Sequence, residues 1–90
     1  MAFETFRFKY NMGNFYHYSQ VLNRAIDPSD IMSPLNMLLI EAYSKRALKY
    51  GRRARDLSSK IGVNLDENFT NMLSCAEKAY EFTKKHNKKS

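Results

Sequence analysis

Apolar residues alternate with polar residues at the start of the chain and then recur at helical spacing. Within residues 1–12, Phe6, Phe8 and Tyr10 share one side of an alternating pattern, which predicts a half-buried strand. The alternative is an irregular arm whose aromatic residues pack on the helices. Over residues 14–26 the apolar positions recur every three or four residues, which predicts a short helix.

The clearest helix signal covers residues 34–61. Ser33 followed by Pro34 is a typical N-cap and first helical residue, and Gly62 is suited to end the helix in the left-handed conformation. An apolar row repeats every seven residues, and a row of small residues beside it lets another backbone approach closely. The apolar row is Ile40, Tyr43, Ala47, Tyr50, Ala54, Leu57 and Ile61, and the small row is Ser44, Gly51 and Ser58.

A third helix is predicted over residues 65–85, because Asn64 and Glu67 have the spacing of a capping box and apolar residues follow at helical intervals. It should fold back antiparallel on the second helix, since the connection is short. Residues 86–90 form a basic tail that we expect to be frayed. The whole chain, residues 1–90, is thus predicted to be one mainly α domain with an N-terminal strand or arm, a short helix and a long helical hairpin.

Size and composition predict a homodimer in a reducing compartment. A 90-residue chain buries only about 60 to 65% of its unfolded surface, and a lone strand needs a partner from another chain. Cys75 is the single cysteine and has no partner for an internal disulfide. No signal peptide or membrane-spanning run is present, so we expect a cytoplasmic protein without membrane contact.

The positive charge is concentrated in residues 44–60. This segment holds seven cations and one acid, a net charge of +6, which equals the formal net charge of the chain. The simplest alternative is an ordinary solvated helix face, but such faces usually mix signs because like charges four residues apart destabilise a helix. The seven cations are Lys45, Arg46, Lys49, Arg52, Arg53, Arg55 and Lys60.

A cationic helix face of this kind predicts a polyanionic partner. We expect it to contact the phosphates of DNA or RNA, which release counterions on binding. Tyrosines could add stacking on bases, and the candidates are Tyr10, Tyr16, Tyr18, Tyr43 and Tyr50. Two alternatives stay open: an accessory adaptor or inhibitor of the phage type that docks on an acidic protein surface, and a protein that sequesters nucleotides.

The first half of the chain resembles the ribbon-helix-helix DNA-binding family. The resemblance lies in the order of strand, short helix and a helix that opens with Ser-Pro-Leu-Asn-Met-Leu-Leu-Ile-Glu-Ala at residues 33–42. In that family two chains pair their strands into a ribbon that enters the major groove. The resemblance implies that Thr5, Arg7 and Lys9 read bases and that the protein has a regulatory role.

Signatures of catalysis and of metal or cofactor binding do not occur in the sequence. His17 and His86 are far apart, and neither lies near Cys75 along the chain. Glycine-rich phosphate loops and paired catalytic acids are also missing. We therefore expect a binding protein that is not an enzyme and uses no cofactor.

Overall fold

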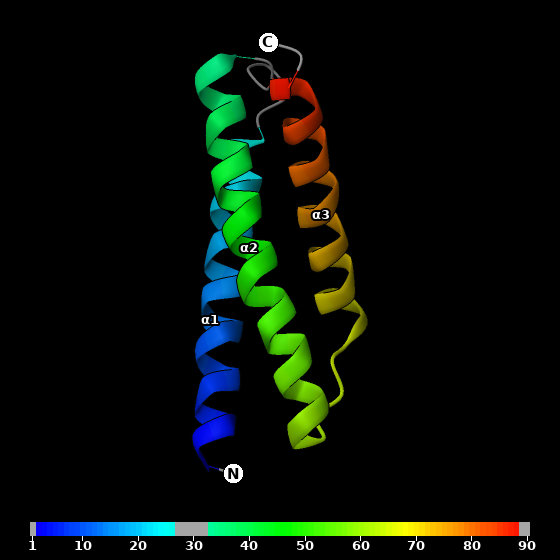
Figure 1. Ribbon diagram of the computed structural model, residues 1–90. Coiled ribbons are helices and arrows are strands. Elements are labelled where there is room, and N and C mark those ends of the chain that lie inside the picture. The colour runs from blue at the N-terminus through cyan, green and yellow to red at the C-terminus, as the bar shows by residue number, and fades with distance from the viewer. Residues whose placement is uncertain (1, 27–32, 89–90) are drawn as a thin grey trace.

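A single helix, α1 (Ala2–Ala25), forms the N-terminal part of the computed structural model, which describes residues 2–26 and 33–88 (Figure 1). Phe8, Phe15 and Leu22 follow one another at seven-residue spacing and face the other helices. Asn11 lies inside the helix, where its side-chain amide donates to the carbonyl of Arg7 at 2.7 Å. The asparagine therefore fits within the helix and does not break it.

The predicted fold class is wrong at this end of the chain. The strand or arm over residues 1–12 and the short helix over 14–26 are one long helix, and the described residues contain no strand. Alternation over seven residues is too short to separate a strand from a helix, and burial of the row beginning at Phe8 decides for the helix. Pro28 predicts that the helix ends in a turn over residues 27–30, and these residues lie outside the described part of the chain.

Helix α2 (Pro34–Ile61) has the bounds that its capping signals predict. The hydroxyl of Ser33 accepts a hydrogen bond from the backbone N–H of Asn36 at 3.2 Å, and Pro34 takes the first helical position. At the other end Gly62 adopts φ 74° and ψ 27°, and its N–H donates to the carbonyl of Ser58. Glycine takes this left-handed conformation without the penalty that a Cβ atom causes.

Helix α3 (Glu67–Lys88) starts two residues after the expected position and ends three residues after it. The cap is Asp66, whose carboxylate accepts a hydrogen bond from the N–H of Phe69 at 2.9 Å, and Asn64 of the predicted capping box precedes it. The helix includes residues 86–88 of the tail that we expected to be frayed. Residues 89 and 90 lie outside the described part of the chain.

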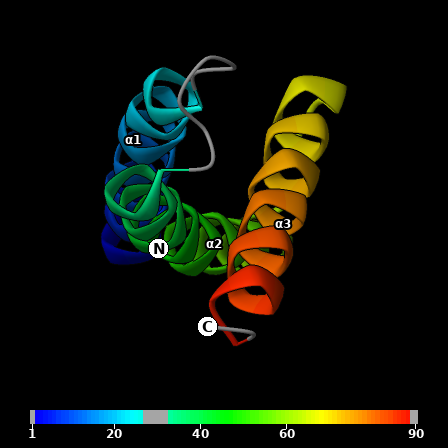
Figure 2. The ribbon, with the colours of Figure 1, turned by 90° about the horizontal axis from the view of Figure 1, so that it is seen from above.

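The three helices alternate in direction and form an elongated body of 46 × 22 × 20 Å (Figure 1). Helix α1 packs along much of α2, while α3 packs on α2 and meets α1 over a small area. Viewed from above, α3 is clearly inclined to the α1–α2 pair (Figure 2). Helix α2, about 40 Å long, is therefore packed against helices of the same chain over its buried residues from Met37 to Ser58, while Leu35 and Leu38 near its start are exposed.

The three helices meet at Gly51. A Cβ atom on this residue would lie 2.7 Å from Cδ1 of Leu73 on α3 and 2.8 Å from two ring carbons of Phe15 on α1. Ser44 and Ser58 in the same row are also buried, and each hydroxyl donates to a backbone carbonyl three residues earlier. At Gly51 the close neighbours are side chains of Phe15 and Leu73, so the structure shows a tight contact there, while the close approach of another backbone to the small row stays a prediction.

Substituting alanine for two of the glycines should change the free energy of unfolding differently. Gly13 is exposed with open space around it, so Gly13→Ala should raise the free energy of unfolding by about 1 kcal/mol through helix propensity. In Gly51→Ala the overpacking cost of about 1 to 3 kcal/mol should cancel or exceed that gain. Thermal and urea unfolding of both variants measure the difference. Equal stabilisation by the two alanines would contradict the close contact at Gly51.

Candidate nucleic-acid interface

Six of the seven cationic residues of α2 project from the side opposite its buried rows, whereas the exposed Arg55 follows buried Leu48 by seven residues and lies at the margin of the buried side. Ile40, Ala47 and Ala54 are at most 2% exposed, which fixes the rotation of the helix and turns its charged residues to solvent. Each of the seven predicted site residues on this helix is exposed: Lys45, Arg46, Lys49, Arg52, Arg53, Arg55 and Lys60. We call this surface the basic face.

The basic face is organised in rows along α2. Arg46, Arg53 and Lys60 recur every seven residues and form a row about 21 Å long, in which Arg46 lies over Tyr18 of α1 and Arg53 lines a pocket with α1 residues. Lys45 and Arg52 form a second row one position earlier, further from α1. Two parallel rows of cations on one rigid helix give a polyanion several simultaneous charge contacts.

Tyrosine rings lie directly beside the first row. Tyr18 of α1 and Tyr50 of α2 stack in parallel with ring centroids 5.8 Å apart, and Tyr10 meets Tyr50 edge-on at 6.4 Å. The guanidinium carbon of Arg46 is 5.7 Å from the Tyr18 centroid, and the ammonium of Lys49 is 5.6 Å from the Tyr50 centroid. These cation–π contacts hold two charges at the junction of α1 and α2.

The remaining aromatic candidates divide between core and surface. Tyr43 and Tyr50 are half-buried and pack against the core, as their place in the apolar row predicts. Of the three consecutive aromatic residues, Tyr16 and His17 are exposed while Tyr18 is half-buried. Consecutive residues of a helix point in different directions, so the three cannot all face inward.

The other predicted site residues, Thr5, Arg7 and Lys9, are exposed on α1. Because α1 is a helix, Thr5 and Lys9 share one side and Arg7 projects from another. A paired strand would have turned all three to the same side. The base-reading ribbon that the family resemblance implies is therefore not formed by these residues, and only Arg7 lies near the residues of the basic face.

A pocket of about 310 Å³ between α1 and α2 was not anticipated from the sequence. Arg53 supplies the wall from α2, and the other walls come from the first turns of α1. The signal that could have revealed it is the spacing of the apolar residues three and four positions apart. The lining residues are Phe3, Phe6, Arg7, Tyr10, Asn11 and Arg53, and we call this site the α1 pocket.

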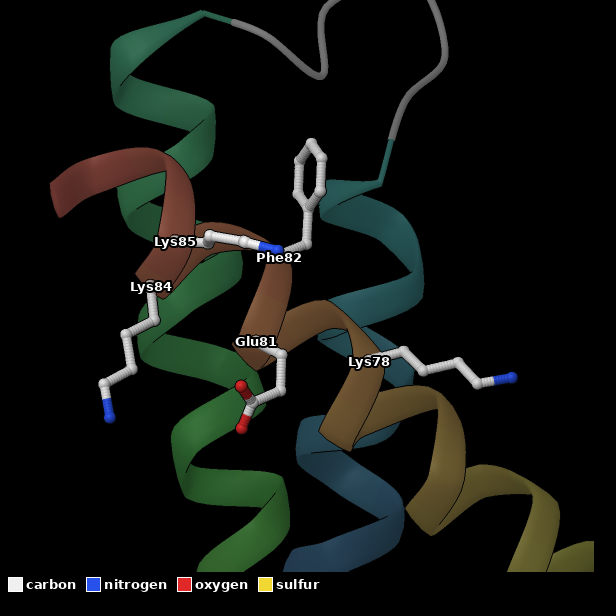
Figure 3. Close-up of a pocket in the computed structure, with 5 residues that line it drawn as sticks. All are labelled: Lys78, Glu81, Phe82, Lys84 and Lys85. Atoms are coloured by element: carbon white, nitrogen blue, oxygen red, sulfur yellow. The ribbon is translucent and has the colours of Figure 1, made fainter. Parts of the chain in front are cut away.

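Helix α3 carries lysines without such a focus. Lys78 and Lys84 point to opposite sides of the helix, and the acidic side chain of Glu81 lies between them (Figure 3). These three residues line a pocket on α3 together with Phe82 and Lys85. The concentrated positive charge is thus a property of α2, whereas α3 has a mixed and divergent set of charges.

No group of three or more His, Cys, Asp or Glu side chains suited to a metal ion occurs within residues 2–26 and 33–88. In the same part of the chain, none of the helices has the length and apolar character needed to cross a membrane. Cys75 is exposed and has a free thiol. Comparisons of the chain with protein-family models, curated proteins and solved structures find no match.

Proposed function

We propose that the protein binds nucleic acid through the basic face of α2. The observation that carries this proposal is that seven exposed cations, with one acid among them, lie on one helix, and that six of them project from the side opposite its buried rows. Such a face attracts phosphates by counterion release and by its summed field. Four of the seven cations are arginines, whose planar fork suits phosphate oxygens.

The contacts with tyrosine favour nucleic acid over an acidic protein surface. Arg46 and Lys49 lie over tyrosine rings at the edge of the basic face, so aromatic surface and positive charge occur together. Proteins that bind single strands combine these two features, because the backbone carries charge and the bases have π faces. An acidic protein surface would use the charge and gain nothing from the neighbouring rings.

Fluorescence anisotropy with labelled strands and duplexes of about 20 nucleotides, as DNA and as RNA, tests the proposal. At about 50 mM salt we expect binding that competing poly-glutamate displaces poorly. Absence of binding to all four probes would contradict the proposal. If poly-glutamate displaced the labelled probe as effectively as unlabelled nucleic acid does, the proposal would also be contradicted. That result would point to an acidic protein as the partner.

A further inference from the structure

The α1 pocket places exposed aromatic rings at one end of the molecule. Phe3, Phe6 and Tyr10 are 70%, 67% and 57% exposed, and their spacing puts them on one stripe of α1. Single exposed aromatic residues are common, whereas a contiguous stripe of three indicates a binding surface. The rings are therefore available to a partner and contribute little to the core.

Two arginines border the same rings. The guanidinium carbon of Arg7 lies 5.8 Å from the centroid of Phe3, and Arg53 reaches the pocket from the basic face of α2. Charge complementarity thus favours an anionic occupant that also offers a flat aromatic surface. A nucleotide has both parts, since its base can stack on the rings while its phosphate meets the guanidinium groups.

Asn11 adds a hydrogen-bonding group to the pocket wall. Its side chain is 4% exposed, and its amide nitrogen is committed to the carbonyl of Arg7. The side-chain oxygen is buried and has no hydrogen-bond partner among the described residues. An unpaired buried acceptor lowers stability, so Asn11 is a polar group of the wall whose hydrogen bonding is incomplete.

We propose that the α1 pocket binds one nucleotide of a single-stranded nucleic acid, with the base against Phe6 and Tyr10 and the phosphate on Arg7 and Arg53. This inference rests on the proposed function, because Arg53 belongs to both surfaces. A strand with one nucleotide in the pocket would continue along the basic face. A volume of about 310 Å³ is at the small end for ligand pockets and suits a single nucleotide. In a duplex both faces of a base are stacked, so the pocket selects an unpaired strand.

Phe6→Ala and Tyr10→Ala test the pocket. Each should weaken binding of a labelled strand of about 20 nucleotides by roughly 5- to 150-fold, the range for removing one stacking ring. Affinity for the matched duplex should stay unchanged. Phe82→Ala is the control, because Phe82 is an exposed ring (47%) on α3 and lies outside the α1 pocket. Circular dichroism checks that each variant keeps its helices.

The outcomes separate this inference from the proposed function. If Arg52→Glu with Arg53→Glu removes binding while Phe6→Ala leaves strand affinity unchanged, the basic face stands and the pocket assignment is overturned. Equal losses for strand and duplex on Phe6→Ala would overturn the selectivity for an unpaired strand. If light scattering shows that Phe6→Ala converts a dimer to a monomer without changing strand affinity, the stripe is an interface between two copies and the inference is wrong.

Discussion

Phe15→Ala should lower the free energy of unfolding by about 3 to 5 kcal/mol, the range for truncating a buried phenylalanine. Phe15 is fully buried, its ring lies 4.8 Å from that of Phe69 on α3, and it closes on Gly51 of α2. Collapse of the surroundings is restricted because three helices meet there. A 90-residue domain has a total stability of about 5 to 13 kcal/mol, so the variant should lose much of it.

The matched control is Phe6→Ala in the same helix. Phe6 is 67% exposed, so its truncation should change stability by no more than about 0.5 kcal/mol. Urea unfolding followed by circular dichroism measures both variants. A strand over residues 1–12 would instead bury Phe6 together with Phe8. A large loss in Phe6→Ala and a small one in Phe15→Ala would therefore contradict the helical structure of α1.

Reversing two charges of the basic face should have the largest effect on binding. Arg52→Glu with Arg53→Glu removes two cations and adds two acids at the centre of α2, where both side chains are exposed. Each reversal replaces an attraction to phosphate of about 1 kcal/mol in water by a similar repulsion, so the affinity should fall roughly 100- to 1000-fold. Anisotropy at low salt measures the change.

The control for this double variant is Lys78→Glu with Lys85→Glu on α3. Both doubles remove two positive and add two negative charges, so they lower the formal net charge of the chain from +6 by the same amount. The lysines are exposed and lie outside the basic face. We expect the α3 double to weaken binding far less. Equal losses would show that total charge alone drives binding, and lost helical circular dichroism in the α2 double would show that its arginines are structural.

Helix α2 was predictable because several independent local signals agree over a long segment. Ser33 and Gly62 mark its ends, and the seven-residue repeat between them gives its rotation, so its exposed cations could be assigned in advance. The position of Gly51 among small residues also anticipated a close helix contact. Caps and periodicity act locally, which is why the sequence reveals them.

Helix α1 was not predictable because its local signals conflict. Gly13 has low helix propensity, and the alternation of Phe6, Phe8 and Tyr10 imitates a strand. What decides the structure is the burial of Phe8 and Phe15 against other helices, a tertiary effect that overrides these propensities. The α1 pocket was missed for the same reason, since its walls meet only when α1 is helical.

The structure removes one ground for predicting a homodimer. The N-terminal segment is a helix, so it does not need a strand of another chain to pair with. Dimerisation stays a prediction. Light scattering at micromolar concentration is the measurement, and a monomer mass would contradict it.

The salt dependence of binding tests the role of the basic face most directly. If the face neutralises about four to six phosphates, the logarithm of the association constant should fall against the logarithm of salt concentration with a slope of about −3 to −5. The double variant of Arg52 and Arg53 should show a clearly shallower slope, and the α3 double should keep that of the unmodified protein. A slope near zero for the unmodified protein would contradict phosphate binding by α2.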